Sequence, residues 1–323
     1  MGARESLDDK LAAIRALRGQ PLTHEQKSEL RRRISDRSNL VVAAAAAFAG
    51  ENTLVELTKD LETAFDRFMV NPVKDDKLCR AKIAIVQALD RMENQTSDLF
   101  LKAATHVQFE PVWAGTEDSA PPLRAAAVIA LARVEGSRCL PLLVDALADP
   151  AKDVRVAAAL ALGAVGTESA GLVLRLKIRL GDRDPDVLSD CLGGLLTIDP
   201  KENLPIVTEF LDPSNEAACE AAAMALGKSR LPEALDPLKR CWQLCHSDEL
   251  GQHLLLAIAI LRRPAATDYL VERVASEPEP IASAALSTLR IFKDDPRLRE
   301  RIERLVDERE SPKLRAEFDR HFR

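Results

Sequence analysis

The chain has 323 residues, with 45 basic and 51 acidic side chains and a formal net charge of −6 at pH 7. Its hydrophobic fraction of 46% and charged fraction of 30% are typical of a globular protein and exclude an intrinsically disordered one. Aromatic residues make up only 4%, whereas Ala and Leu are abundant and β-branched residues form no long runs. This composition predicts an all-α fold with small side chains between closely packed helices.

The opening segment does not have the pattern of a secretory signal. Its sequence, MGARESLDDK, is charged, unlike a secretory signal, and the longest apolar run, residues 40–50, is shorter than the roughly 20 residues of a membrane span. The six cysteines are scattered, most of them inside apolar helical patterns. We therefore expect a cytoplasmic protein with reduced thiols and no membrane contact. The abundance of Ala, and of Arg over Lys, is typical of a GC-rich bacterial genome.

The two ends of the chain differ from its middle. Residues 1–70 predict atypical N-terminal capping helices over residues 6–17, 24–34 and 54–69, longer and more charged than those that follow. The arginines between residues 31 and 37 lie among acidic side chains there, a pattern typical of a solvated helix face. Residues 296–323 carry a similar mixture of charges and predict C-terminal capping helices.

Between these ends, residues 75–295 contain an internal repeat. DPAKDVRVAAALALGAVG (residues 149–166) and DSAPPLRAAAVIALARVEG (residues 118–136) align at a spacing of 31 residues. The same apolar position recurs less cleanly along the chain, at Phe48, Leu89, Leu195, Leu226, Ile258 and Leu289.

Each unit holds two apolar helical patterns. Val154, Ala158 and Leu162 recur at the spacing of one helix face. The second helix of that unit shows an apolar pattern at Leu172, Leu174, Leu176 and Leu180. Because such a hairpin cannot bury its apolar face alone, neighbouring units must stack. The prediction is a single domain over residues 1–323, an α-solenoid of about eight helical hairpins.

These repeats resemble the HEAT repeat family, most closely the short HEAT-like repeats named after the phycobilisome lyases. The residues that carry the resemblance are DVRVAAALALGAVG (153–166) and PLRAAAVIALARVEG (122–136). The resemblance implies a structural ladder, in which an Asp at the end of one helix pairs with an Arg six residues later. Asp118 with Arg124 and Asp149 with Arg155 fit that spacing. Later repeats lack the Arg, so the ladder is expected in two units only.

The interval between Leu89 and Leu131 is 42 residues, about ten longer than the later intervals. The excess falls in residues 106–122, HVQFEPVWAGTEDSAPP. Insertions in solenoids project from one edge and often carry binding residues. Trp is also the residue most enriched in interface hot spots. The insertion is therefore a candidate binding site, and the alternative is that Trp113 folds back over an exposed helix end.

Within the insertion, we expect Trp113 and Phe109 to be apolar anchors for a protein partner, with Glu110 and Asp118 on the rim. His106 belongs to the same candidate site. The spacing of His106, Glu110 and Asp118 matches no metal-binding motif, so we expect no metal there.

Other features of the sequence predict no chemistry. Cys241 and Cys245 lie four residues apart in an apolar helix and are expected to be small buried hydrophobes rather than zinc ligands. The sequence has no G-x-S-x-G, Walker or G-x-G-x-x-G motif, so we predict no catalytic residues and no cofactor. The helices of the VRVAAALALG type, which line the concave face in HEAT-like solenoids, lack the Lys and Arg that nucleic acid needs.

The resulting hypothesis is a non-catalytic scaffold or adaptor that binds a protein or peptide through the concave face and the 106–122 insertion. The resemblance implies an alternative, a bilin lyase-like factor that attaches or detaches a chromophore. Nucleic-acid binding is a third function, disfavoured by the charge of the chain.

Overall fold

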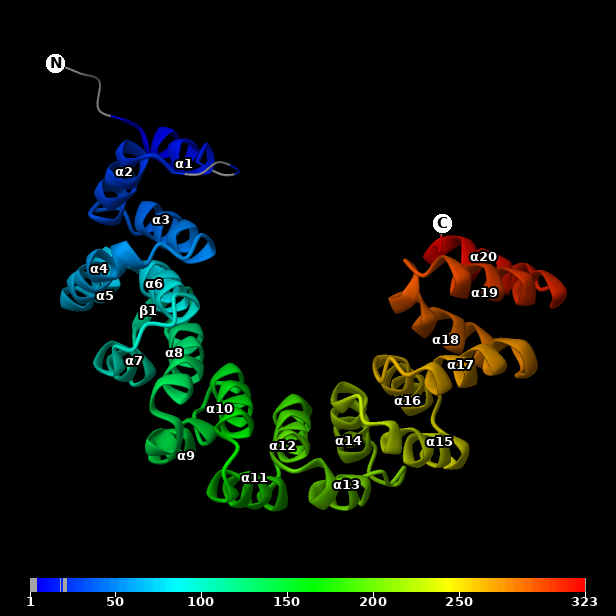
Figure 1. The fold of residues 1–323 in the computed structure, drawn as a ribbon. Helices are drawn as coiled ribbons and strands as arrows, with labels where there is room; N and C mark the ends of the chain where they lie inside the picture. The colour runs from blue at the N-terminus through cyan, green and yellow to red at the C-terminus, as the bar shows by residue number, and fades with distance from the viewer. Residues whose placement is uncertain (1–4, 18, 20–21, 323) are drawn as a thin grey trace. The chain divides into compact units, whose positions relative to one another are not determined.

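Helices arranged in two rows make up nearly all of the computed structural model, which describes residues 5–17, 19 and 22–322 (Figure 1). The first four residues of the charged opening segment lie outside the described residues. The chain divides into two compact units, Met1–Val165 and Gly166–Arg323. The structure confirms the predicted all-α solenoid. Among the described residues, no helix is both long enough and apolar enough to span a membrane.

In the first unit, consecutive helices of the first row pack against each other. This row consists of α1 (Leu7–Arg15), α3 (Asn39–Glu51), α6 (Arg80–Arg91), α8 (Pro121–Glu135) and α10 (Lys152–Val165). The second row consists of α2 (His24–Ile34), α4 (Thr58–Val70), α7 (Ser97–Ala104) and α9 (Leu140–Leu147). Short helical turns connect them: η1 (Val55–Leu57), α5 (Pro72–Asp75), η2 (Lys77–Cys79) and η3 (Gly136–Cys139).

The second unit repeats this arrangement (Figure 1). Its first row consists of α12 (Pro185–Ile198), α14 (Glu216–Ser229), α16 (Asp248–Ile260), α18 (Glu279–Leu289) and α20 (Pro312–Phe322). Its second row consists of α11 (Glu168–Leu180), α13 (Pro200–Thr208), α15 (Leu235–Leu244), α17 (Pro264–Ser276) and α19 (Pro296–Glu308), with the turns η4 (Pro232–Ala234) and η5 (Arg290–Phe292).

Local sequence chemistry fixes where many of these helices begin. Ser6 and Thr23 form capping boxes with the residues three positions later, which satisfies backbone N–H groups at the starts of α1 and α2. The carboxylates of Asp199 and Asp295 accept backbone N–H groups at the starts of α13 and α19. Pro occupies the first turn of several other helices, where its missing N–H is not needed.

Small residues set the spacing between first-row helices. A Cβ atom added to Gly50 of α3 would lie 2.7 Å from the Cα atom of Ala88 in α6. A Cβ atom added to Gly227 of α14 would lie 2.6 Å from the carbonyl oxygen of Ala257 in α16. This backbone-to-backbone approach is what the Ala-rich composition predicts.

The structure corrects the apolar pattern expected for α11. Leu174 is buried, together with Ala170 and Ile178, but Leu172, Leu176 and Leu180 are exposed. Residues two positions apart on a helix differ by about 200° around its axis, so the two sets of side chains point in opposite directions. An alternation of Leu with other residues therefore cannot mark a single buried face here.

Candidate functional site

The 106–122 insertion contains a β-hairpin, which the sequence did not predict. β1 (Phe109–Val112) pairs antiparallel with β2 (Gly115–Asp118), and Val112 is opposite Gly115, so Trp113 and Ala114 form the turn. Gly115 has φ +137°, a conformation open to glycine but strained for other residues. Trp113 is consequently held at the tip, where its side chain is wholly exposed.

A buried polar network fixes the base of the hairpin. Lys82 of α6, whose side chain is 0% exposed, donates from Nζ to Oε1 of Gln108 at 2.6 Å. Gln108 Nε2 in turn donates to the carbonyl oxygen of Asp76 at 2.9 Å and to Oε1 of Glu110 at 2.7 Å. Burial lowers the pKa of Lys82. The side-chain amide of Gln108 therefore joins the insertion to α6 through Lys82 and to the turn before α6 through Asp76.

The carboxylate of Asp76 completes this network. It is buried and accepts the backbone N–H groups of Ala81 at 2.9 Å and Lys82 at 3.1 Å, so it caps the start of α6. Its second oxygen lies 3.9 Å from Lys82 Nζ. The positive ammonium group is thus compensated inside the protein.

Glu110 does not take the rim position expected for it. It is 8% exposed, and its Oε1 atom accepts hydrogen bonds from Ser119 Oγ and from the backbone N–H of Leu78, both at 2.6 Å. Side chains alternate along a strand, so the exposure of Phe109 places Glu110 on the opposite, inner face. Burial acts to raise the pKa of Glu110, but the hydrogen bonds outweigh it and hold this pKa below its usual value.

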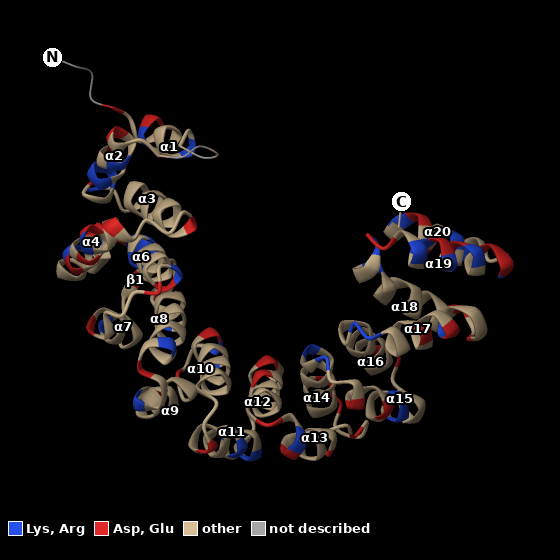
Figure 2. Ribbon diagram, in the orientation of Figure 1, with Lys and Arg blue, Asp and Glu red and all other residues tan. Residues whose placement is uncertain are grey.

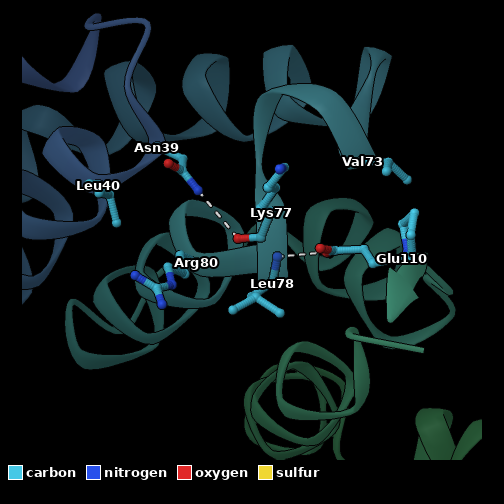
Figure 3. Close-up of a pocket in the computed structure, with 8 residues that line it drawn as sticks. Asn39, Leu40, Val73, Lys77, Leu78, Arg80 and Glu110 are labelled. Carbon is cyan, nitrogen blue, oxygen red and sulfur yellow. Dashed lines mark hydrogen bonds between the residues drawn. The ribbon is translucent and has the colours of Figure 1, made fainter. Parts of the chain in front are cut away.

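The hydrogen bond from Leu78 to Glu110 supports a strained turn. Leu78 and Cys79 have φ values of 60° and 52°, in the left-handed region that only a few non-glycine residues adopt. Asn39 Nδ2 also donates to the carbonyl oxygen of Lys77 at 3.3 Å (Figure 3). This conformation directs the Leu78 side chain outward, where it is half exposed.

Leu78 borders a cavity of about 510 Å³ on one side of the hairpin (Figure 3). The lining residues are Asn39, Leu40, Val73, Lys77, Leu78, Arg80, Glu110 and Pro111. Lys77 and Arg80 are exposed and form no ion pair with any residue that the structure describes. This side of the hairpin is therefore apolar with two positive charges at its edge.

Arg124 connects the other side of the hairpin to the next repeat. Its guanidinium donates to Asp118 Oδ2 at 2.7 Å and to the two carboxylate oxygens of Asp149 at 2.9 and 3.1 Å. Burial acts to raise the pKa of Asp118, but hydrogen bonds from the Ala120 N–H and Arg124 lower it below its usual value. Arg155 donates to the backbone carbonyls of Asp149 and Pro150.

His106 lies inside the network rather than on the outer surface of the hairpin. Its Nε2 atom is 3.2 Å from Gln108 Oε1 and 3.4 Å from Lys82 Nζ. Burial lowers the pKa of His106, which favours the neutral imidazole at pH 7. Of the five expected partner-binding residues, only Trp113 and Phe109 present exposed apolar surface.

Phe109 opens onto a second cavity, of about 710 Å³. Apolar residues of the insertion and of α7, α9 and α10 line it together with polar and charged side chains. The lining residues are Ala104, Thr105, Val107, Phe109, Asp118, Arg124, Leu142, Asp145, Ala146, Asp149, Pro150 and Val154. Val107 and Val112 add further exposed apolar surface on the insertion. The hairpin thus separates two cavities and presents an aromatic side chain at its tip. Among the described residues, no group of three or more His, Cys, Asp or Glu side chains is arranged so that it could hold a metal ion.

Sequence reasoning missed the residues that hold the site together, namely Lys82, Gln108, Asp76 and Ser119. The sequence contains one signal that Lys82 is buried. It lies at an apolar position of the pattern that continues with Ile85, Val86 and Leu89, and a lysine at such a position is fully buried only when it is paired.

Comparisons with known proteins match residues 109–175 and 172–259 to the family model of HEAT repeats. No curated protein matches the chain. Among solved structures, a chain of the complex of CpcE and CpcF of phycocyanin lyase from Nostoc sp. PCC7120 is 18% identical. The alignment covers 91% of this chain and 97% of that chain, with a TM-score of 0.37. Human deoxyhypusine hydroxylase in complex with glycerol is 14% identical, over 88% of this chain and 89% of that chain, with a TM-score of 0.28.

Proposed function

We propose that this chain, whose residues 109–259 are HEAT repeats, is an interaction scaffold that binds a protein or peptide segment at the hairpin of its insertion. Stacked helical repeats build extended surfaces and are typical of protein-interaction scaffolds. One observation carries the finer proposal: Trp113 is wholly exposed at the tip of a hairpin whose base is fixed by buried hydrogen bonds. An exposed Trp on a rigid support is the arrangement of an interface hot spot.

The surface beside Trp113 supports the same proposal. Phe109, Val107 and Val112 are exposed on the same insertion, and Phe109 borders the larger cavity. A partner side chain that enters this cavity would bury apolar surface against α7 and α9. Because the hairpin is already ordered, binding would lose less conformational entropy than the ordering of a free loop.

The first-row helices supply a second part of the proposed surface. They are the helices of the VRVAAALALG type, and Ile129 of α8 and Leu160 of α10 are exposed on them. In the second unit, α12, α16 and α18 of this row contain no Lys or Arg, and the basic residues of the row lie on α14 and α20 (Figure 2). This composition favours a protein segment over nucleic acid, whose phosphates require several cations.

The test is affinity capture from a lysate of the native host, with the wild type beside Trp113→Ala. We expect one dominant protein on the wild type, bound about 30-fold more weakly by the variant, as for a hot-spot loss of about 2 kcal/mol. Leu180→Ala is the matched control because Leu180 is an exposed apolar residue far along the chain from the hairpin. It should capture the partner like the wild type.

Two outcomes would refute the proposal. Equal capture by the wild type and by Trp113→Ala would remove the hairpin tip from the interface. A bound pigment, nucleic acid or metal without a protein partner would replace the scaffold with another function.

A further inference from the structure

We infer that Cys219 and Cys241 are a redox modification site, a pair of thiols that a small-molecule disulfide oxidises to a protein disulfide. The inference is independent of the hairpin, which lies in the other compact unit. It concerns the connection between α14 and α15, which carry one thiol each.

The geometry of the two thiols carries the inference. Their Sγ atoms lie 3.3 Å apart, although the residues are separated by 22 positions in the sequence. A disulfide bond is about 2.05 Å long, so the sulfur atoms must approach by only about 1.3 Å. Side-chain rotation and a small helix displacement can supply this approach.

This pair differs from the other cysteines of the described residues. Cys139 donates its thiol to the carbonyl oxygen of Gly136, and Cys245 donates to that of Ser247. The structure gives no other contact between two Sγ atoms in the described residues. Sequence spacing would instead suggest Cys241 with Cys245, but α15 ends at Leu244 and Cys245 lies beyond it in an extended conformation. In the tertiary structure, Cys241 instead contacts Cys219 of the preceding helix, α14.

The pair has one thiol suited to act as the nucleophile. When the Cys219 thiol donates the hydrogen bond between the two sulfur atoms, it stabilises the thiolate of Cys241, which lowers the pKa of Cys241. The same hydrogen bond, together with burial, raises the pKa of Cys219. Both side chains are buried, so oxidation must wait for local opening and should be slow.

The reaction is two successive thiol–disulfide exchanges with glutathione disulfide. The Cys241 thiolate attacks one glutathione sulfur, forms a mixed disulfide and displaces a glutathione thiolate. The Cys219 thiolate then attacks the Cys241 sulfur, which forms the protein disulfide and displaces the second glutathione thiolate. The two protons of the cysteine thiols end on the two glutathione molecules, and the two electrons of the oxidation reduce the glutathione disulfide.

The experiment incubates the full-length protein with glutathione disulfide, quenches with acid and labels the remaining thiols with N-ethylmaleimide in denaturant. We expect a species lighter by two hydrogen atoms that takes up four labels instead of six. Proteolysis should give a peptide that joins Cys219 to Cys241, and dithiothreitol should reverse it. Because the cross-link closes a loop, it should also raise the thermal unfolding midpoint by several degrees.

Two variants separate this pair from the nearby, partly buried thiol of Cys245. Cys245→Ser should form the same disulfide, since Cys245 lines a cavity of about 370 Å³ and has no part in the bond. Cys219→Ser should stop at a mixed disulfide with glutathione and show no rise in the midpoint. Six free thiols after prolonged oxidation of the wild type, or a bond between Cys241 and Cys245, would overturn the inference. Neither result depends on what the hairpin binds.

Discussion

At the scale of single residues, buried polar groups decide the structure of the candidate site. A lysine, an aspartate and a glutamine are all buried at the base of the hairpin, and each has hydrogen-bond partners there. Removal of one partner leaves a buried group unsatisfied, which costs more than the hydrogen bond itself contributes. The orientation of Trp113 and Phe109 therefore depends on residues that are buried beneath the hairpin.

Glu110→Gln tests this dependence. The variant keeps the size of the side chain but removes the charge that accepts hydrogen bonds from Leu78 and Ser119. We expect a loss of about 1–3 kcal/mol of local stability at pH 7, measured as faster hydrogen exchange of the Leu78 amide. Glu117→Gln is the matched control, since Glu117 is opposite Glu110 in the register but exposed. It should exchange like the wild type.

The difference in local stability between the wild type and Glu110→Gln should depend on pH. The pKa of Glu110 is lowered in the folded protein, so the unfolded chain binds the proton more readily. The stabilisation is fully present above the unfolded pKa, about 4.3, and is lost as the pH falls through the lower folded value. The gap between the wild type and Glu110→Gln should therefore shrink at pH 3. An equal gap at pH 3 and pH 7 would show that the carboxylate charge does not hold the turn.

At the scale of helices, the contact between first-row neighbours is set by residues without side-chain bulk. Gly227→Ala would place a Cβ atom 2.6 Å from the carbonyl oxygen of Ala257, which cannot move without α16. We expect a loss of about 1–3 kcal/mol in the free energy of unfolding, as for an overpacked core. Denaturant titration followed by circular dichroism measures it.

Gly193→Ala is the control for that substitution. Gly193 also lies inside a first-row helix of the second unit, α12, but an added Cβ atom there would meet nothing within 4 Å. Since Ala has the higher helix propensity, this variant should be more stable by about 0.5–1 kcal/mol. Opposite signs for the two substitutions are expected. Equal effects would mean that propensity, and not the contact between α14 and α16, governs both positions.

The helices and their repetition could be predicted because both depend on local periodicity. Val154, Ala158 and Leu162 are buried in α10, as their spacing predicts. The hairpin could not be predicted in this way, because its strands have only four residues each and Pro111 interrupts one of them. Its stability comes from Lys82 and Asp76, which lie more than 25 positions before it in the chain. Such long-range contacts leave no periodic trace in the sequence.

The sequence also misled on which residues are buried and which are exposed. Glu110 is charged and was expected on the rim, but strand alternation and three hydrogen bonds place it inside. Leu172 and Leu176 are apolar and were expected in a packed pattern, but their helix face is exposed. In both cases the residue type is a weaker guide than the face of the element on which it lies.

At the scale of the whole molecule, two compact units share one architecture but differ in their chemistry. The first unit carries the hairpin, with its buried network and two adjacent cavities. The second carries the proposed thiol pair between α14 and α15. In repeat proteins each unit contacts mainly its neighbours, so such features can be added to one repeat without changing the others. Binding of a protein or peptide segment at the hairpin is the central proposal for this chain.

The most direct measurement is photo-cross-linking in the native host, with Trp113→p-benzoylphenylalanine in the full-length protein. Leu180→p-benzoylphenylalanine serves as the control at another exposed apolar position. We expect light to link position 113 to one defined protein, an excess of unmodified wild type to suppress this adduct, and position 180 not to form it. No adduct at position 113, or the same adducts at both positions, would contradict the hairpin as the binding site.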